Sequence, residues 1–264
     1  MERITSRDNQ RLAAVRKVRD GIDKDAIFIE GKRLAKEALR SGLSISECYF
    51  SDALDEKRLI NDLKTAVEAV TIVAEMAFAS IADTKNSQGI VLLAKRPKWS
   101  LNDLTTRLRG DALPLIVYLD EINNPANLGS VVRTAEAAAV AGLMLSPGST
   151  DAYSAKAIRG SMGSAFRLPV VEAVEFDAAL AFAADNGLTT IAADAHSAPS
   201  YASIDWRAPH LLVLGSEAHG IRSRNLERIS ERIQIPIGDV ESLNLAVAAG
   251  IILFEAKRQG DVSG

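Results

Sequence analysis

Short apolar runs alternate with longer amphipathic stretches along the chain, and Gly, Pro, Asn or Asp stands at most of the junctions. The apolar runs predict strands over residues 26–31, 45–51, 70–74, 89–95, 115–120, 142–145, 169–172, 189–193 and 211–214. The amphipathic stretches predict helices from a cap at Ser6 to Arg19, over residues 31–42, 55–68, 128–140, 155–166 and 176–187, and briefly from Glu75. This alternation is typical of α/β proteins, in which helices cover the faces of a sheet.

The C-terminal stretch predicts a loop that holds a ligand. An apolar strand over residues 211–214 runs directly into Gly-Ser-Glu, and Gly215 and Gly220 permit backbone conformations and close approaches that a side chain would block. A second short strand ends at Pro236, and Ser242 is then the expected N-cap of a long helix rich in Ala and Leu. The free N–H groups at the start of that helix would point toward a ligand in the loop.

The same pattern divides the chain into two domains. Residues 1–96 form a compact α/β unit, and residues 97–113 are expected to be a linker with one amphipathic stretch over residues 101–108. Residues 114–264 form the second domain, which starts on a buried strand. Because its strands are apolar throughout rather than alternating, they favour a mostly parallel sheet with both faces covered.

Composition narrows the class of protein. With 264 residues, 47% of them hydrophobic and 25% charged, the chain has the composition of a globular protein with room for two cores. Its single cysteine, Cys48, excludes an internal disulfide framework, and its three histidines lack the spacing of zinc ligands, so we expect no metal. The charged N-terminus does not resemble a signal peptide, and the most apolar run, residues 243–254, is too short to span a membrane. We therefore expect a cytoplasmic protein with no membrane partner.

Cations are concentrated near the N-terminus, although the net charge of the chain is −3. They are Arg3, Arg7, Arg11, Arg16, Lys17 and Arg19, followed by Lys32, Arg33, Lys36 and Arg40. On the first predicted helix, the leading six would form a basic stripe that could follow an RNA backbone. The alternative interpretation is a solvated helix face.

Several common catalytic motifs are missing from the sequence. No G-x-G-x-x-G follows a predicted strand, and the glycine pair at positions 215 and 220 lacks the Lys-Ser/Thr of a phosphate-binding loop. No G-x-S-x-G nucleophile motif is present either. These absences argue against dinucleotide-dependent and serine-hydrolase chemistry.

A third pattern, Asn-x-Gly-x-x-x-Arg at Asn127, Gly129 and Arg133, follows the strand predicted over residues 115–120. With the two C-terminal stretches it completes three motifs in order, and the chain resembles the SpoU (TrmH-like) RNA ribose 2′-O-methyltransferases of the SPOUT superfamily. The resemblance implies a trefoil-knotted C-terminal methyltransferase domain, preceded by a small α/β substrate-binding domain similar to certain ribosomal proteins. It also implies a homodimer built on the C-terminal domain and S-adenosylmethionine as the cofactor.

The resemblance assigns roles to residues of the three motifs. Cofactor contacts are expected from Gly215, Ile235, Leu243 and Asn244, with Gly215 placed where a side chain would intrude on the cofactor. Catalytic roles are expected for Arg133, Asn127, Glu217, Ser242 and Asn244. Two positions depart from the family pattern: Asn124 stands where Asp is frequent, and Glu241 stands where a second Ser is frequent. His219 occupies a position that varies in the family, and we expect no catalytic role for it.

Arg133 matches the catalytic arginine of the family, for which a general-base role is one hypothesis. Arginine keeps its proton near neutral pH, so we favour a clamp on the target phosphate that also stabilises the forming alkoxide. Viewed without the flanking motifs, Arg133 is better interpreted as an exposed helix residue paired with Glu136, and the two flanking motifs reverse that interpretation.

The predicted function is transfer of a methyl group from S-adenosylmethionine to a ribose 2′-hydroxyl, with ribosomal RNA favoured as the substrate. Two alternatives stay open: a tRNA 2′-O-methyltransferase, and a catalytically silent RNA-binding dimer scaffold. Joint retention of Asn127, Arg133, Glu217 and Asn244 favours the enzyme.

Overall fold

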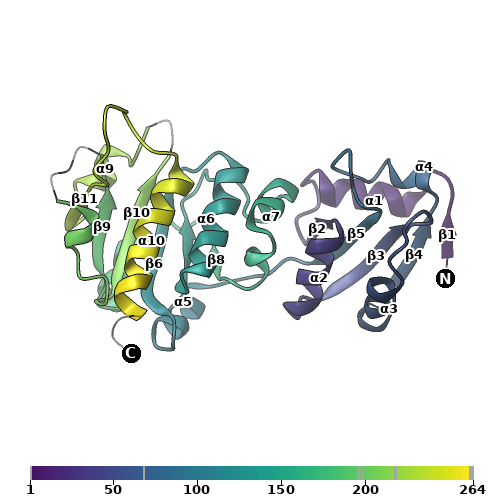
Figure 1. The fold of residues 1–264 in the computed structure, drawn as a ribbon, viewed down its shortest axis with the longest axis horizontal. Helices are drawn as coiled ribbons and strands as arrows, with labels where there is room; N and C mark the ends of the chain where they lie inside the picture. The colour runs from purple at the N-terminus through teal and green to yellow at the C-terminus, as the bar shows by residue number, and fades with distance from the viewer. Residues whose placement is uncertain (1, 68, 196, 198, 217–218, 262–264) are drawn as a thin grey trace. The chain divides into compact units, whose positions relative to one another are not determined.

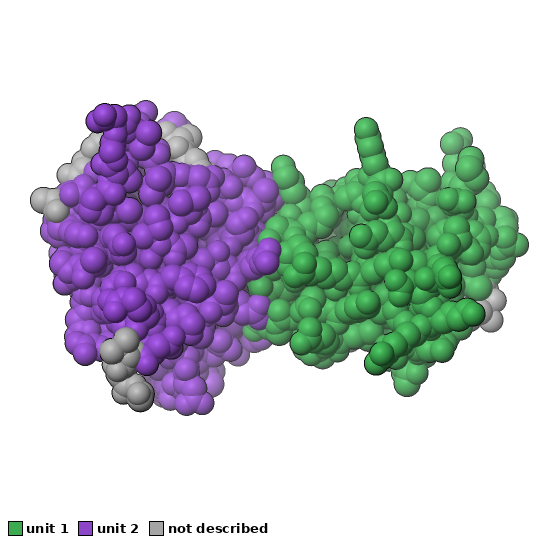
Figure 2. Space-filling view, viewed as in Figure 1, with its two compact units in different colours: residues 1–97, 153–167 green, residues 98–152, 168–264 purple. Residues whose placement is uncertain are grey.

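The computed structural model describes residues 2–67, 69–195, 197, 199–216 and 219–261 (Figure 1). They form two compact units, coloured separately in Figure 2: residues 1–97 with 153–167, and residues 98–152 with 168–264. Each unit contains its own sheet, so the predicted α/β class is confirmed. The domain limits drawn from the sequence, 1–96 and 114–264, stay a prediction, and the grouping of residues 153–167 with the N-terminal unit was not anticipated.

The N-terminal unit is a mixed five-stranded sheet in the order β1-β4-β3-β5-β2. Strands β1 and β3 run parallel to β4, whereas β5 is antiparallel to both β3 and β2. Its strands are β1 (Glu2–Ile4), β2 (Ala26–Glu30), β3 (Ile45–Ser51), β4 (Ala69–Val73) and β5 (Ile90–Lys95). Its helices are α1 (Gln10–Arg19), α2 (Lys32–Arg40), α3 (Lys57–Ala66), α4 (Glu75–Phe78), α7 (Ala155–Ser161) and the short 3-10 turn η1 (Ser164–Phe166).

The predicted start of the first helix was wrong. Asn9, not Ser6, caps α1, and its side chain accepts a hydrogen bond from the Arg11 N–H. The residues before it contain the strand β1, which is too short and too charged to show in the apolar pattern. Arg3 and Arg7 therefore lie outside the helix, and the six cations do not form a stripe on one helix face.

The second unit is a six-stranded parallel sheet in the order β11-β9-β10-β6-β7-β8, which confirms the predicted parallel arrangement. Its strands are β6 (Leu113–Asp120), β7 (Val140–Leu145), β8 (Val170–Val171), β9 (Thr189–Ala193), β10 (His210–Gly215) and β11 (Glu231–Ile233). Its helices are α5 (Leu101–Leu108), α6 (Pro125–Ala137), α8 (Phe176–Asp185), α9 (Ser223–Leu226) and α10 (Leu245–Asp261), with a short 3-10 turn η2 (Tyr201–Ser203). The central strands β6 and β10 are buried along their length, which explains why they lack polar alternation.

Two helix starts in this unit differ from the sequence prediction. Helix α6 begins at Pro125 rather than near Leu128, because Asn124 is an N-cap whose side chain accepts from the Ala126 N–H and Pro125 fits the first helical position. Helix α10 is capped by Asn244 rather than by Ser242. The Asn244 Oδ1 accepts from the Ala246 N–H at 2.9 Å, so the helix starts after the Ser-Leu-Asn sequence instead of within it.

Helices α6 and α10 pack side by side against the sheet (Figure 1). Gly250 of α10 lies next to α6, where a β-carbon would come within 3.8 Å of the Thr134 Cγ2. In the part of the chain that the structure describes, no helix combines the length and apolar character needed to cross a bilayer.

Candidate functional site

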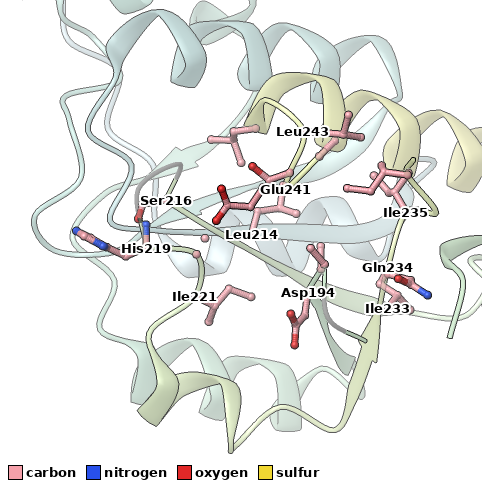
Figure 3. A pocket seen from close by; sticks show the side chains of 18 of the residues that line it. Asp194, Leu214, Ser216, His219, Ile221, Ile233, Gln234, Ile235, Glu241 and Leu243 are labelled. Atoms are coloured by element: carbon pink, nitrogen blue, oxygen red, sulfur yellow. Dashed lines mark hydrogen bonds between the residues drawn. The ribbon is translucent and has the colours of Figure 1, made fainter. Parts of the chain in front are cut away.

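A cavity of roughly 460 Å³ opens where β9, β10 and β11 end, at the carboxyl edge of the parallel sheet (Figure 3). The segments that line it are residues 193–195, 214–216, 219–221, 233–235 and 241–243, together with Leu226, Ile237, Leu245 and Ala248. Open parallel sheets bind ligands at this edge, and the volume is that of a small-molecule site. The two C-terminal stretches of the sequence therefore meet around one cavity, as predicted.

The cavity walls are mainly aliphatic, with polar groups at a few places. Leu214, Ile233, Ile235 and Leu243 supply apolar surface from three different segments. The charged side chains among the described lining residues are acidic: Asp194, directly after β9, and Glu241, before α10. No described Lys or Arg lines the cavity. The aliphatic walls suit a flat ring system, and the two carboxylates favour a ligand whose net charge is positive rather than negative.

Gly215 closes the loop of the cavity rather than leaving room for a ligand. The loop is pinched by two backbone hydrogen bonds between Ser216 and Gly220, at 3.1 and 2.9 Å. A β-carbon on Gly215 would lie 2.0 Å from the Gly220 carbonyl carbon and 2.2 Å from the Ile221 nitrogen. A side chain at position 215 would therefore meet the backbone of its own loop, and the expectation that it would also intrude on the cofactor stays a prediction.

A buried ion pair anchors the returning end of this loop. Asp120, the last residue of β6, is fully buried and is the register partner of Gly215 on β10. Its carboxylate lies 2.6 Å from the Arg222 Nη2 and accepts a hydrogen bond of 3.0 Å from the Asn225 Nδ2. Hydrogen bonding to Asp120 raises the pKa of Arg222, although burial acts in the opposite direction. The strand that leads into the Asn-x-Gly-x-x-x-Arg motif is thereby tied to the loop that lines the cavity.

The structure brings most of the predicted site residues together. Gly215, Ile235, Ser242 and Leu243 line the cavity. Asn244 lies at the start of α10 and donates from its Nδ2 to the Asn127 Oδ1 of α6 at 3.4 Å, so the first and third motifs meet.

Among the described catalytic candidates, Arg133, Asn127 and Asn244 are not residues that line the cavity, and Arg133 also lacks a contact that ties it to the site. Arg133 is exposed on α6, is not among the residues that line the cavity, and forms no hydrogen bond or ion pair with another described residue. The predicted role of Glu217 concerns a position outside the described residues.

Sequence reasoning missed Asp194, Gln234 and Glu241 as residues of the site. A signal was available for Asp194, because the strand over residues 189–193 was predicted correctly and the residue after a parallel strand lies at the ligand-binding edge. Among the described residues, no group of three or more His, Cys, Asp or Glu side chains could hold a metal ion.

Comparisons with known proteins agree with this geometry. The model of the SpoU rRNA methylase family matches residues 114–254, and the model for RNA 2′-O ribose methyltransferase substrate binding matches residues 28–100. The chain is 28% identical to the 23S rRNA (guanosine(2553)-2′-O)-methyltransferase RlmP of Bacillus subtilis, over 97% of this chain and 100% of that protein. It is 30% identical to the mitochondrial rRNA methyltransferase 3B of Danio rerio, over 94% of this chain and 68% of that protein.

Two solved structures share the fold over nearly the whole chain. The AdoMet-bound rRNA methyltransferase of Sinorhizobium meliloti superposes with a TM-score of 0.84 at 27% identity, covering 97% of both chains. A structure described as an RNA 2′-O ribose methyltransferase superposes with a TM-score of 0.81 at 28% identity, covering 98% of this chain and 99% of that one. Fold and site thus define an RNA ribose methyltransferase of the SPOUT class. Within that class, the chain belongs to the SpoU rRNA methylase family.

Proposed function

We propose that this enzyme transfers the methyl group of S-adenosylmethionine to a ribose 2′-hydroxyl in ribosomal RNA. The observation that carries the proposal is the aliphatic cavity at the ends of β9 to β11, next to the contact between Asn127 and Asn244. RlmP of Bacillus subtilis, which matches 97% of this chain, is named as a 23S rRNA methyltransferase, and this supports ribosomal RNA over tRNA as the substrate. Such a target would place the enzyme in the compartment that holds ribosomes, which is the cytoplasm in our prediction.

The residues of the cavity fit this cofactor. Leu214, Ile235 and Leu243 provide apolar surface for the adenine ring, and the backbone of the loop closed by Gly215 offers hydrogen-bonding groups. S-adenosylmethionine has a sulfonium and an ammonium group against a single carboxylate, so its net positive charge complements an acidic lining. When bound, it supplies an electrophilic methyl group.

Arg133 would act on the RNA rather than on the cofactor. Its guanidinium is exposed and forms no hydrogen bond or ion pair with another described residue, so it can donate two hydrogen bonds to a phosphate of the target nucleotide. In the transfer, the ribose 2′-oxygen would form a bond to the methyl carbon while the bond between that carbon and sulfur breaks. The hydroxyl proton leaves to phosphate or water, since an arginine near neutral pH does not accept it. The charge of Arg133 stabilises the oxygen as that proton departs.

A second copy of the chain would cover the face formed by α6 and α10. Val247 and Phe254 of α10 are 51% and 49% exposed, and with the half-buried Ile251 they form an apolar stripe at i, i+4 and i+7. Solvent rarely faces such a stripe in an isolated protein, which supports the homodimer implied by the family. Arg133 lies on the neighbouring helix, so the dimer would hold this arginine close to its interface. The trefoil knot likewise remains a prediction from the family.

Calorimetry with S-adenosylmethionine and transfer of labelled methyl groups to deproteinised ribosomal RNA test the proposal together. Binding and transfer, with the label mapped to a ribose 2′-oxygen, are the expected results. A protein that binds RNA without binding the cofactor would instead be a silent scaffold. Label found in tRNA and not in ribosomal RNA would move the substrate to the tRNA alternative.

A further inference from the structure

The three arginines of α1 are engaged within their own unit, whereas Lys17 on the same helix is exposed. Arg11 pairs with Glu47 of β3 at 3.1 Å. Arg16 donates to the Ser80 Oγ at 3.2 Å, and Arg19 donates to the Ser80 carbonyl at 3.0 Å. An arginine in such a contact must give it up before it can clamp a phosphate. These side chains therefore hold α1 in place and offer little positive charge to a ligand.

Helix α2 differs from α1 in how its cations are placed. Four of its nine residues are Lys or Arg. Arg33, Lys36 and Arg40 are all exposed, and their i, i+3 and i+7 spacing puts them on one face of the helix. Arg33 and Lys36 form no hydrogen bond or ion pair with any residue that the structure describes. We call these three residues the α2 basic face.

The acidic groups beside this face are already neutralised. Glu37 lies between the cations and pairs with Arg40 at 3.2 Å and with Arg167 at 3.0 Å. Glu56 pairs with Lys32 at 3.1 Å, and the hydrogen bond from Lys32 lowers the pKa of this carboxyl group. Since cations outnumber the acids here, the face is locally positive on a chain whose net charge is −3.

The α2 basic face is also held rigidly. The opposite face of the helix buries Leu34, Ala35 and Ala38 in the unit. Its first turn is fixed where the Lys32 N–H donates to the Gln88 Oε1 at 2.9 Å. A binding surface on a fixed helix loses little conformational freedom when a ligand arrives, which favours binding.

We infer that the α2 basic face is the surface of the N-terminal unit that contacts the phosphate backbone of the RNA substrate. The inference rests on the proposed function and specifies which surface of the protein binds the RNA. Charge complementarity selects the occupant. Arg33 and Lys36 are exposed and form no hydrogen bond or ion pair with a described residue, so they can contact backbone phosphates directly, whereas the arginines of α1 would first have to leave their partners.

The test compares two double variants of the full chain that remove the same charge from the same unit. Arg33→Ala/Lys36→Ala removes two cations of the α2 basic face. Arg7→Ala/Lys17→Ala removes two exposed cations near and on α1, and serves as the matched control. Affinity for deproteinised ribosomal RNA is measured between about 50 and 200 mM salt, and affinity for S-adenosylmethionine is measured in parallel.

The α2 double variant is expected to bind RNA more weakly. Its affinity should also fall less steeply with salt, with a slope of log affinity against log salt that is smaller in magnitude by about 1.4 to 1.8, since each phosphate contact contributes about 0.7 to 0.9. The control variant should keep the wild-type slope, and both should keep wild-type affinity for the cofactor. Equal slopes for all three proteins, or equal losses in the two variants, would overturn the assignment of the face. Failure of the wild type to bind the cofactor or to methylate RNA would instead count against the proposed function.

Discussion

Gly215 and Arg133 are expected to contribute in different ways, Gly215 through the path of the backbone and Arg133 through its side chain. Gly215 has no room for a β-carbon because the loop folds back on it at 2.0 Å. Arg133, which does not line the cavity, has an exposed side chain, and in the proposed mechanism its fork geometry clamps the phosphate. The two residues therefore make separable predictions about binding and about rate.

Gly215→Ala is expected to displace the segment from Gly220 to Ile221, because the new methyl group overlaps that backbone. Overpacking of this kind costs about 1 to 3 kcal/mol and should distort the cavity wall. We predict a lower melting temperature and weaker binding of S-adenosylmethionine, measured by thermal unfolding and calorimetry. Gly238→Ala is the control, since a β-carbon at Gly238 meets nothing within 4 Å. A Gly215→Ala protein with unchanged stability and cofactor affinity would contradict this account of the loop.

Arg133→Lys keeps the positive charge but loses the bidentate contact with phosphate. We expect its methyl-transfer rate to fall nearly as far as that of Arg133→Ala, by roughly a hundredfold to a thousandfold, which is the usual effect of removing a group that stabilises a developing oxyanion. Cofactor affinity should stay close to wild type in both variants. Near-normal turnover in the lysine variant, measured with labelled cofactor and ribosomal RNA, would exclude the clamp.

At the scale of elements, the cavity depends on the junction between β6 and the segment that follows β10. Asp120 and Arg222 join these segments, which are far apart in the sequence, and Asn225 of α9 completes the buried cluster. A buried charge needs its partner far more than an exposed one does. The position of the cavity loop therefore depends on this ion pair.

Arg222→Ala should leave the fully buried Asp120 carboxylate without its ion partner. We predict a loss of about 3 kcal/mol in the free energy of unfolding, at the lower end of the usual range because the Arg222 side chain is 25% exposed. Urea unfolding of the full chain measures this loss, and cofactor affinity should fall with it. Arg224→Ala removes an exposed arginine from the same short helix and should change neither quantity. Equal stability of the two variants would show that the ion pair contributes nothing measurable.

At the scale of the whole molecule, the proposed dimer depends on the exposed apolar stripe of α10, which includes Val247 and Phe254. Phe254→Glu places a charge in that stripe, and burial of an unpaired charge opposes association. We predict that the wild type forms the proposed dimer and that this variant stays monomeric at the same concentration, as measured by sedimentation or light scattering.

Met76→Glu provides the control for this experiment. Met76 is 88% exposed and lies on α4 of the N-terminal unit, whereas the proposed interface residues belong to the other unit. It should keep the wild-type assembly state. A dimer that survives the Phe254→Glu change would place the interface elsewhere.

The sequence by itself determined the α/β class, the parallel sheet of the second unit and the motifs that form the cavity. These features are encoded locally, by apolar strands and by glycines at their ends, so a linear pattern contains them. Helix starts at Asn9 and Asn244 were misplaced because Ser and Asn cap equally well, and only packing decides between nearby candidates.

Only the tertiary structure decided which charges are free and which are paired. Arg11 and Arg33 look alike in the sequence, yet Arg11 meets Glu47 from another element whereas Arg33 faces outward. The partner of Asp120 is likewise 102 residues away in the chain. The free energy of a charged side chain depends on neighbours that folding brings from distant segments, and no local pattern specifies them.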